Sequence, residues 1–112
     1  MNEDRILGSL LGLAVGDALG TTVEFQARDS FPPVTDMVGG GVFSLAPGQW
    51  TDDTSMALCI AASLVETGTY DPRDQLARFV RWYRDGYLSS TGRCFDIGNQ
   101  TLTALGEFEA TG

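Results

Sequence analysis

The 112-residue sequence contains no histidine and no lysine, and its seven basic residues are all arginine. The missing histidine excludes a Ser-His-Asp triad, a Cys-His pair and a histidine metal site. The missing lysine excludes a Schiff base and a P-loop. Fifteen Asp and Glu residues give a formal net charge of −8, so we expect no nucleic-acid partner, because such binding needs clustered cations. The chemistry that remains belongs to carboxylates, hydroxyls, arginines, backbone amides and cations held by carboxylates.

Cysteine is also scarce. Cys59 and Cys94 lie far apart and match no zinc-binding spacing. Cys59 lies in an apolar helical run, which favours a buried free thiol over half of a disulfide.

No basic stretch precedes the first apolar run, because the chain opens with Asn2, Glu3 and Asp4. A secretory signal would be basic there. The apolar run from Ile6 to Gly20 is interrupted by glycines and is too short to span a bilayer. We therefore expect a cytoplasmic protein with no membrane partner, in which this run forms a buried helix.

The patterns along the chain predict an all-α fold, because no segment shows convincing strand alternation. Four main helices are expected in a single domain, over residues 3–19, 51–66, 72–85 and 99–108. Asp71 and Pro72 are typical of a helix start, and Gly86 of a helix end. A long Gly/Pro-rich loop is expected between the first two helices, over residues 21–50.

Two helices carry further expectations. The first has apolar residues on more than one face, which predicts a central position. Its glycines recur every four residues, from Gly8 to Gly20, which predicts close packing against another helix. On the third helix, the arginines Arg73, Arg78, Arg81 and Arg84 are expected to form the solvated face.

Four acidic positions could carry chemistry: Asp17, Glu24, the pair Asp52-Asp53, and Asp96. Asp17 lies at the C-terminal end of its helix, where the macrodipole disfavours an anion. The adjacent carboxylates of Asp52 and Asp53 repel each other, and a divalent cation would resolve that repulsion. Plain alternatives stay open: a solvent-facing Asp17, a surface Glu24, and helix caps at Asp52 and Asp96.

Three segments together resemble, in order, the ADP-ribosylglycohydrolase family, which includes the dinitrogenase reductase-activating glycohydrolases. They are Gly16-Asp17-Ala18-Leu19-Gly20 with Glu24-Phe25, then Pro47-Gly48-Gln49-Trp50-Thr51-Asp52-Asp53-Thr54-Ser55-Met56, then Phe95-Asp96-Ile97-Gly98-Asn99-Gln100-Thr101. The middle block is the most specific of the three.

The resemblance implies an orthogonal helical bundle with a binuclear Mg²⁺ or Mn²⁺ centre. It implies hydrolysis of the glycosidic bond between ADP-ribose and an acceptor, in an ADP-ribose-containing substrate. By this resemblance the metal ligands are Thr51, Asp52 and Asp53, the catalytic residues are Glu24 and Asp96, and the substrate-binding residues are Asp17, Gly98 and Asn99.

The family also carries an Asp-x-Asp-Thr/Ser motif that completes the metal site, and this sequence has no such motif. We therefore expect a chain that lacks the C-terminal half of the family domain, and whose site is completed by that half or by a second chain. The alternative is a non-catalytic remnant or interaction module that keeps the N-terminal motifs.

Overall fold

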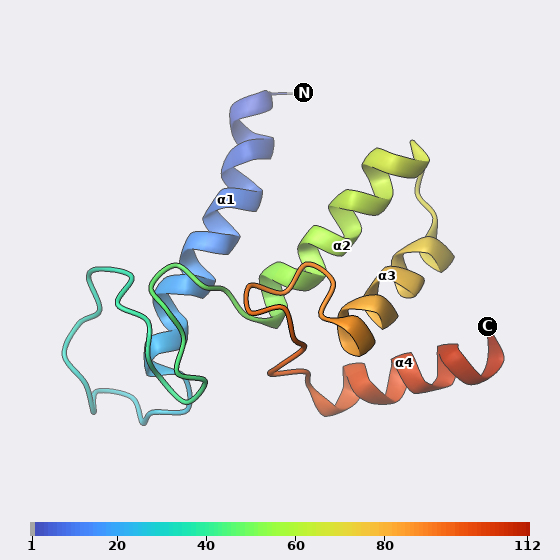
Figure 1. The fold of residues 1–112 in the computed structure, drawn as a ribbon. Helices are drawn as coiled ribbons and strands as arrows, with labels where there is room; N and C mark the ends of the chain where they lie inside the picture. The colour runs from blue at the N-terminus through green and yellow to red at the C-terminus, as the bar shows by residue number, and fades with distance from the viewer. Residues whose placement is uncertain (1) are drawn as a thin grey trace. The chain divides into compact units, whose positions relative to one another are not determined.

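A computed structural model describes residues 2–112 and contains four α-helices (Figure 1). They are α1 (Glu3–Gly20), α2 (Asp52–Thr67), α3 (Pro72–Asp85) and α4 (Asn99–Thr111), and the 3-10 helix η1 (Thr21–Val23) follows α1. Residues 2–112 contain no strand beyond an isolated bridge between Gly40 and Leu45. The predicted all-α class and the four helices are confirmed.

The chain divides into two compact units, Met1–Thr54 and Ser55–Gly112. The first holds α1, η1, the long loop and the first residues of α2. The second holds the rest of α2 together with α3 and α4.

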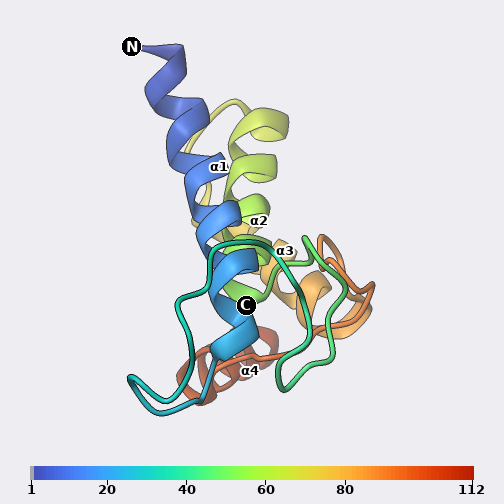
Figure 2. The ribbon, with the colours of Figure 1, turned by 90° about the vertical axis from the view of Figure 1, so that its left-hand side faces the viewer.

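In the first unit, the long loop folds back beside the C-terminal half of α1 (Figures 1 and 2). The hydroxyl of Thr22 donates to the carbonyl of Gly39 at 2.9 Å. Gly41 has φ +71°, and a Cβ there would lie 2.8 Å from the carbonyl oxygen of Thr21. Glycine is therefore needed at this position, both for its left-handed backbone and for the close approach to η1.

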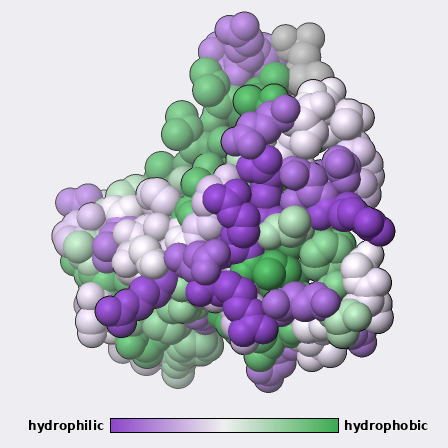
Figure 3. All heavy atoms as spheres, turned by 45° about the vertical axis from the view of Figure 1, so that its right-hand side comes forward, coloured by the Kyte–Doolittle hydropathy of each residue, from purple (hydrophilic) through white to green (hydrophobic). Residues whose placement is uncertain are grey.

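The predicted burial of the first helix is wrong. Ala18 is the one buried residue of α1, and apolar side chains such as Leu11, which is 60% exposed, lie open to solvent. Figure 3 shows hydrophobic residues on the surface of the molecule. A Cβ added at any of the four glycines Gly8, Gly12, Gly16 and Gly20 would meet nothing within 4 Å in the described structure. The physical reason is that the first unit offers α1 only η1, the loop and the start of α2 as neighbours.

The segment Glu3–Val23 is long and apolar enough to cross a membrane, with 21 residues and a mean hydropathy of 1.6 over its most apolar 18-residue window. It is longer than the apolar run that the sequence suggests, because the helix includes the polar residues that flank that run. Core helices of soluble proteins and signal sequences meet the same criteria, so this property by itself assigns no location.

In the second unit, α3 begins at the predicted residue, Pro72. The carboxylate of Asp71 accepts from the backbone N–H of Asp74 at 3.1 Å, and Pro72 follows in the first turn. Gly86 ends α3 in the left-handed conformation. Trp82, Cys59 and Leu105 form the buried core of this unit.

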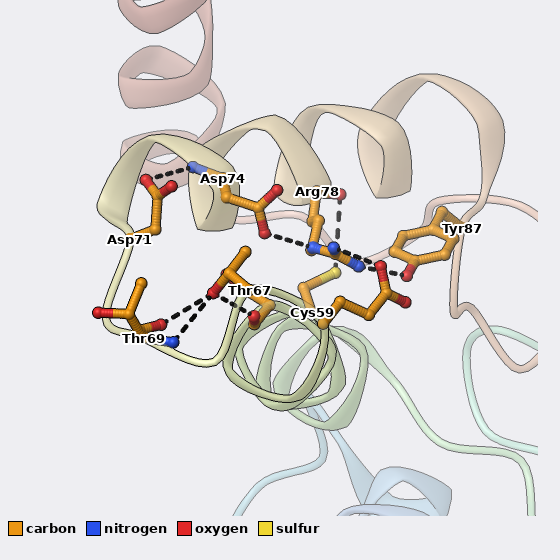
Figure 4. A network of polar contacts seen from close by, with 9 residues as sticks. Cys59, Thr67, Thr69, Asp71, Asp74, Arg78 and Tyr87 are labelled. Atoms are coloured by element: carbon orange, nitrogen blue, oxygen red, sulfur yellow. Dashed lines mark hydrogen bonds and ion pairs between the residues drawn. The ribbon is translucent and has the colours of Figure 1, made fainter.

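Arg78 lies at the centre of a polar network and is buried, so its predicted solvation is wrong (Figure 4). Its guanidinium donates to the carboxylates of Asp74 and Glu66, each at 2.7 Å, and to the hydroxyl of Tyr87 at 3.0 Å. Burial of the charge is tolerated because these partners satisfy the guanidinium. The predicted free thiol of Cys59 is confirmed, and burial raises its pKa to about 11.

Because space is open around Gly12, Gly12→Ala should stabilise this chain by about 0.8–1.0 kcal/mol, which is the difference in helix propensity. Gly41→Ala is the opposite control, since it meets both left-handed strain and the Thr21 carbonyl, and it should destabilise the chain. Urea unfolding of the two variants checks both signs. A destabilised Gly12→Ala variant would show that the glycine stripe is packed.

The Arg78 network predicts an acid-sensitive contribution to stability. Hydrogen bonds from Arg78 hold the pKa values of Glu66 and Asp74 below their ordinary range. This contribution is therefore present above the unfolded-state pKa values and is lost as the pH falls through the lower folded-state values. Glu66→Gln should reduce the loss of stability on acidification from about pH 6 to about pH 3. Glu107→Gln, an exposed control, should leave that loss unchanged in urea unfolding, and equal losses in both variants would contradict the prediction.

Candidate functional site

The carboxylate of Asp17, near the end of α1, accepts four hydrogen bonds from the start of α2. Its Oδ1 accepts from the Thr51 hydroxyl at 2.6 Å. Its Oδ2 accepts from the Thr54 hydroxyl at 2.7 Å and from the backbone N–H groups of Thr51 at 2.9 Å and Thr54 at 3.3 Å. Asp17 therefore caps a helix that begins 35 residues later in the chain.

This arrangement explains an aspartate at an unfavourable helix position. The C-terminal end of α1 repels an anion, whereas the free N–H groups at the start of α2 attract one. Thr51 and Thr54 are 4% and 1% exposed, so their polar groups are withdrawn from water and are satisfied by Asp17. The alternative of a solvent-facing Asp17 is wrong.

A pocket of about 270 Å³ opens beside this junction. Five of the predicted site residues line it: Asp17, Glu24, Thr51, Asp52 and Asp53. The Thr21 hydroxyl donates to the Glu24 carboxylate at 3.4 Å, which holds Glu24 at the wall formed by η1. Glu24 is half-buried and lines this pocket, which excludes the plain surface alternative.

The other three predicted residues, Asp96, Gly98 and Asn99, belong to the second unit. Gly98 is the N-cap residue of α4 and supplies no side-chain cap, and Asn99 is the first residue of that helix. The N-cap position of this helix is therefore occupied by Gly98 and not by Asp96. Asp96 has φ +60°, a left-handed conformation that an L-residue adopts at a cost. Costly backbone of this kind is common at functional sites.

The donor atoms in the pocket suit a hard cation. Thr51, Asp52 and Asp53 offer hydroxyl and carboxylate oxygens, which are the ligands that Mg²⁺ and Mn²⁺ prefer. No cluster of three or more His, Cys, Asp or Glu side chains arranged to hold a metal ion occurs within residues 2–112. The residues therefore fit a cation in chemistry, and its coordination would need further ligands.

Two features of this region were not predicted from the sequence. Thr54 is a direct partner of Asp17, and a contact across 37 residues leaves no local pattern. Phe25, next to Glu24, is 75% exposed with φ +66°, and its ring packs edge-to-face on Phe43 with centroids 6.5 Å apart. The sequence shows an aromatic residue beside Glu24, but neither its exposure nor its left-handed backbone could be predicted from it.

Loss of the Asp17 cap should destabilise the chain. Asp17→Ala leaves two N–H groups and two hydroxyls without their acceptor, and we expect a loss of about 2–3 kcal/mol in the free energy of unfolding. Asp85→Ala is the matched control, because Asp85 also ends a helix but is exposed. That control should be neutral or slightly stabilising in urea unfolding. Equal effects of the two variants would show that the Asp17 contacts contribute nothing to stability.

Comparison with known proteins identifies the family of the chain. The ADP-ribosylglycohydrolase family model matches residues 1–112. An ADP-ribosylarginine hydrolase Tri1 from Serratia proteamaculans is 57% identical over 94% of this chain and 28% of its own length. The ADP-ribosyl-[dinitrogen reductase] glycohydrolase of Rhodospirillum rubrum is 44% identical over 87% of this chain and 32% of its own length.

The solved structure of an ADP-ribosylglycohydrolase-related protein complex superposes with a TM-score of 0.81 and 50% identity. That match covers 97% of this chain and 34% of the solved one, so the chain spans about a third of the length of the relatives that it matches. The chain belongs to the ADP-ribosylglycohydrolase family, whose N-terminal part it matches.

Proposed function

We propose that this chain is the N-terminal part of a hydrolase that cleaves the glycosidic bond between ADP-ribose and an arginine side chain. Family membership supports hydrolysis of ADP-ribose conjugates. The arginine acceptor is inferred from relatives at 57% and 60% identity, both named ADP-ribosylarginine hydrolase. The observation that carries the proposal is the gathering of Glu24, Thr51, Asp52 and Asp53 around one pocket.

We propose Thr51, Asp52 and Asp53 as ligands of a Mg²⁺ or Mn²⁺ centre that is binuclear in the complete site. Such a centre, when bound, orients ribose hydroxyls and polarises water. The chain's own contribution is to present three neighbouring oxygen-bearing side chains at the start of α2, where the helix dipole also favours negative charge.

Glu24 is the proposed catalytic carboxylate. Glycosidic cleavage proceeds through an oxocarbenium-like state, and a carboxylate can stabilise that positive charge or accept a proton from the attacking water. Glu24 lines the pocket and its Oε2 accepts from Thr21, which limits the orientations of the carboxylate. We propose Asp96 as the second catalytic residue, on a loop that contacts the ribose, and Gly98 and Asn99 as substrate-binding residues at the start of α4. For Asp17 we propose a place at the substrate pocket that it lines.

We propose that further ligands from additional sequence, or from a second chain, complete the cation site. Three side chains from one short segment leave most positions of an octahedral Mg²⁺ to water or other groups. Residues 1–112 alone should accordingly bind Mn²⁺ only at millimolar concentration and show little hydrolysis. The alternative of a non-catalytic interaction module predicts no hydrolysis even when further ligands complete the site.

The cation site is tested by titration of Mn²⁺ into the 112-residue chain, followed by paramagnetic broadening of backbone amide signals. Signals near residues 51–53 should broaden first, and Asp52→Asn and Asp53→Asn should each weaken the effect. Asp52→Asn should also slightly stabilise the cation-free chain, because it relieves carboxylate repulsion. Asp85→Asn is the control and should leave the broadening near residues 51–53 unchanged. Broadening that ignores Asp52→Asn and Asp53→Asn would contradict the proposed ligands.

The reaction is tested in a chimera, in which residues 1–112 replace the matching segment of the Serratia proteamaculans relative. The chimera should release ADP-ribose from ADP-ribosylarginine, and Glu24→Gln should abolish release without unfolding it. Glu107→Gln is the control and should stay active. A folded chimera that binds Mn²⁺ but lacks activity would favour the interaction module.

A further inference from the structure

Asp17 accepts hydrogen bonds from Thr51, whose hydroxyl oxygen is one of the proposed cation ligands of the pocket. We propose that Asp17 is a positioning residue, which fixes the Thr51 hydroxyl as a donor and so leaves the lone pairs of Thr51 Oγ1 available to a cation. This inference rests on the proposed function, because it requires the cation site at Thr51, Asp52 and Asp53.

The direction of the hydrogen bond carries the argument. An ionised carboxylate has no proton and can only accept, so the 2.6 Å contact uses the single hydroxyl proton of Thr51. A hydroxyl oxygen then retains lone pairs and no donor. That is the state in which a neutral hydroxyl can coordinate a hard cation.

The same carboxylate also fixes the backbone around this oxygen. Thr51 is held twice, through its hydroxyl by Oδ1 and through its N–H by Oδ2, which restricts both its rotamer and its main chain. Thr54 is likewise held twice by Oδ2. Thr51 is the proposed ligand that these hydrogen bonds hold directly, so we expect the effect of Asp17 on cation affinity to act through the Thr51 hydroxyl.

An amide in place of the carboxylate cannot reproduce this pattern. Asn has one accepting oxygen and one donating NH₂ group. In Asp17→Asn, the NH₂ group faces either the Thr51 hydroxyl or the Thr54 donors, so one of these bonds is lost or reversed. Removal of a partner that orients a metal ligand commonly lowers metal affinity about 10–100-fold, and we expect a loss in this range.

The test is a double-mutant cycle on the affinity of the 112-residue chain for Mn²⁺, measured by the amide broadening described above. Thr51→Val removes the hydroxyl and keeps the shape of the side chain. If Asp17 acts through this hydroxyl, Asp17→Asn should lower the affinity of the unaltered chain, yet change that of the Thr51→Val chain by no more than about twofold. Thr54→Val is the matched control, because Thr54 shares the carboxylate but does not line the pocket. In that background Asp17→Asn should keep its full effect.

Three outcomes would overturn the inference. Equal losses of affinity in the Thr51 and Thr51→Val backgrounds would mean that Asp17 is itself a ligand or acts by charge alone. A loss of stability without a loss of affinity would leave Asp17 as a helix cap only. An absence of Mn²⁺ broadening, or broadening unaffected by Asp52→Asn, would instead refute the proposed cation site, and the inference would fail with it.

If the Asp17→Asn variant does not fold, Asp17→Glu takes its place in the same double-mutant cycle. Glu keeps the accepting charge but lengthens the side chain by one methylene, so it displaces the Thr51 oxygen without removing its acceptor. A loss of affinity confined to the background that retains the Thr51 hydroxyl supports the inference. A loss that persists in Thr51→Val contradicts it.

Discussion

The carboxylate of Asp17 joins the C-terminal end of α1 to the N-terminal end of α2, and the candidate site lies at this junction. Asp17 closes α1 and caps α2, and it takes up both N–H groups and both hydroxyls of Thr51 and Thr54. Helix starts have N–H groups without partners, and those groups are usually satisfied by a residue of the same turn. Here Asp17, 34 positions before Thr51, accepts the hydrogen bonds. The position of the pocket therefore depends on the end of α1.

The composition of the chain limits what such a junction can do. With neither histidine nor lysine, the pocket is lined by carboxylates, hydroxyls and small apolar residues. Oxygen donors of this kind suit a hard cation and suit the stabilisation of a positively charged sugar. The membership of the chain in a family of ADP-ribosyl hydrolases is consistent with both properties.

In the second unit, a positive charge is likewise satisfied by several hydrogen bonds. Arg78 is buried, and its guanidinium has two carboxylates and a phenol as partners. Glu66 and Tyr87 come from segments outside α3, so the network ties three parts of the chain together. In each unit, a charged side chain is satisfied in part by hydrogen bonds with groups outside its own helix.

Local signals in the sequence determined the helices, since caps, prolines and glycines act within one turn; Asp71, Pro72 and Gly86 fix the ends of α3 in this way. The block Thr51-Asp52-Asp53 likewise suggested a cation site from the sequence alone, because adjacent carboxylates are visible without any tertiary contact. The periodicity of the sequence shows that α1 is apolar, but it does not show whether another part of the protein covers the helix. The predicted burial of α1 was therefore wrong. Only the tertiary structure decided the partners of Asp17 and the contacts of Arg78 with Glu66 and Tyr87, because hydrogen bonds across 9 to 37 residues depend on the path of the backbone between them.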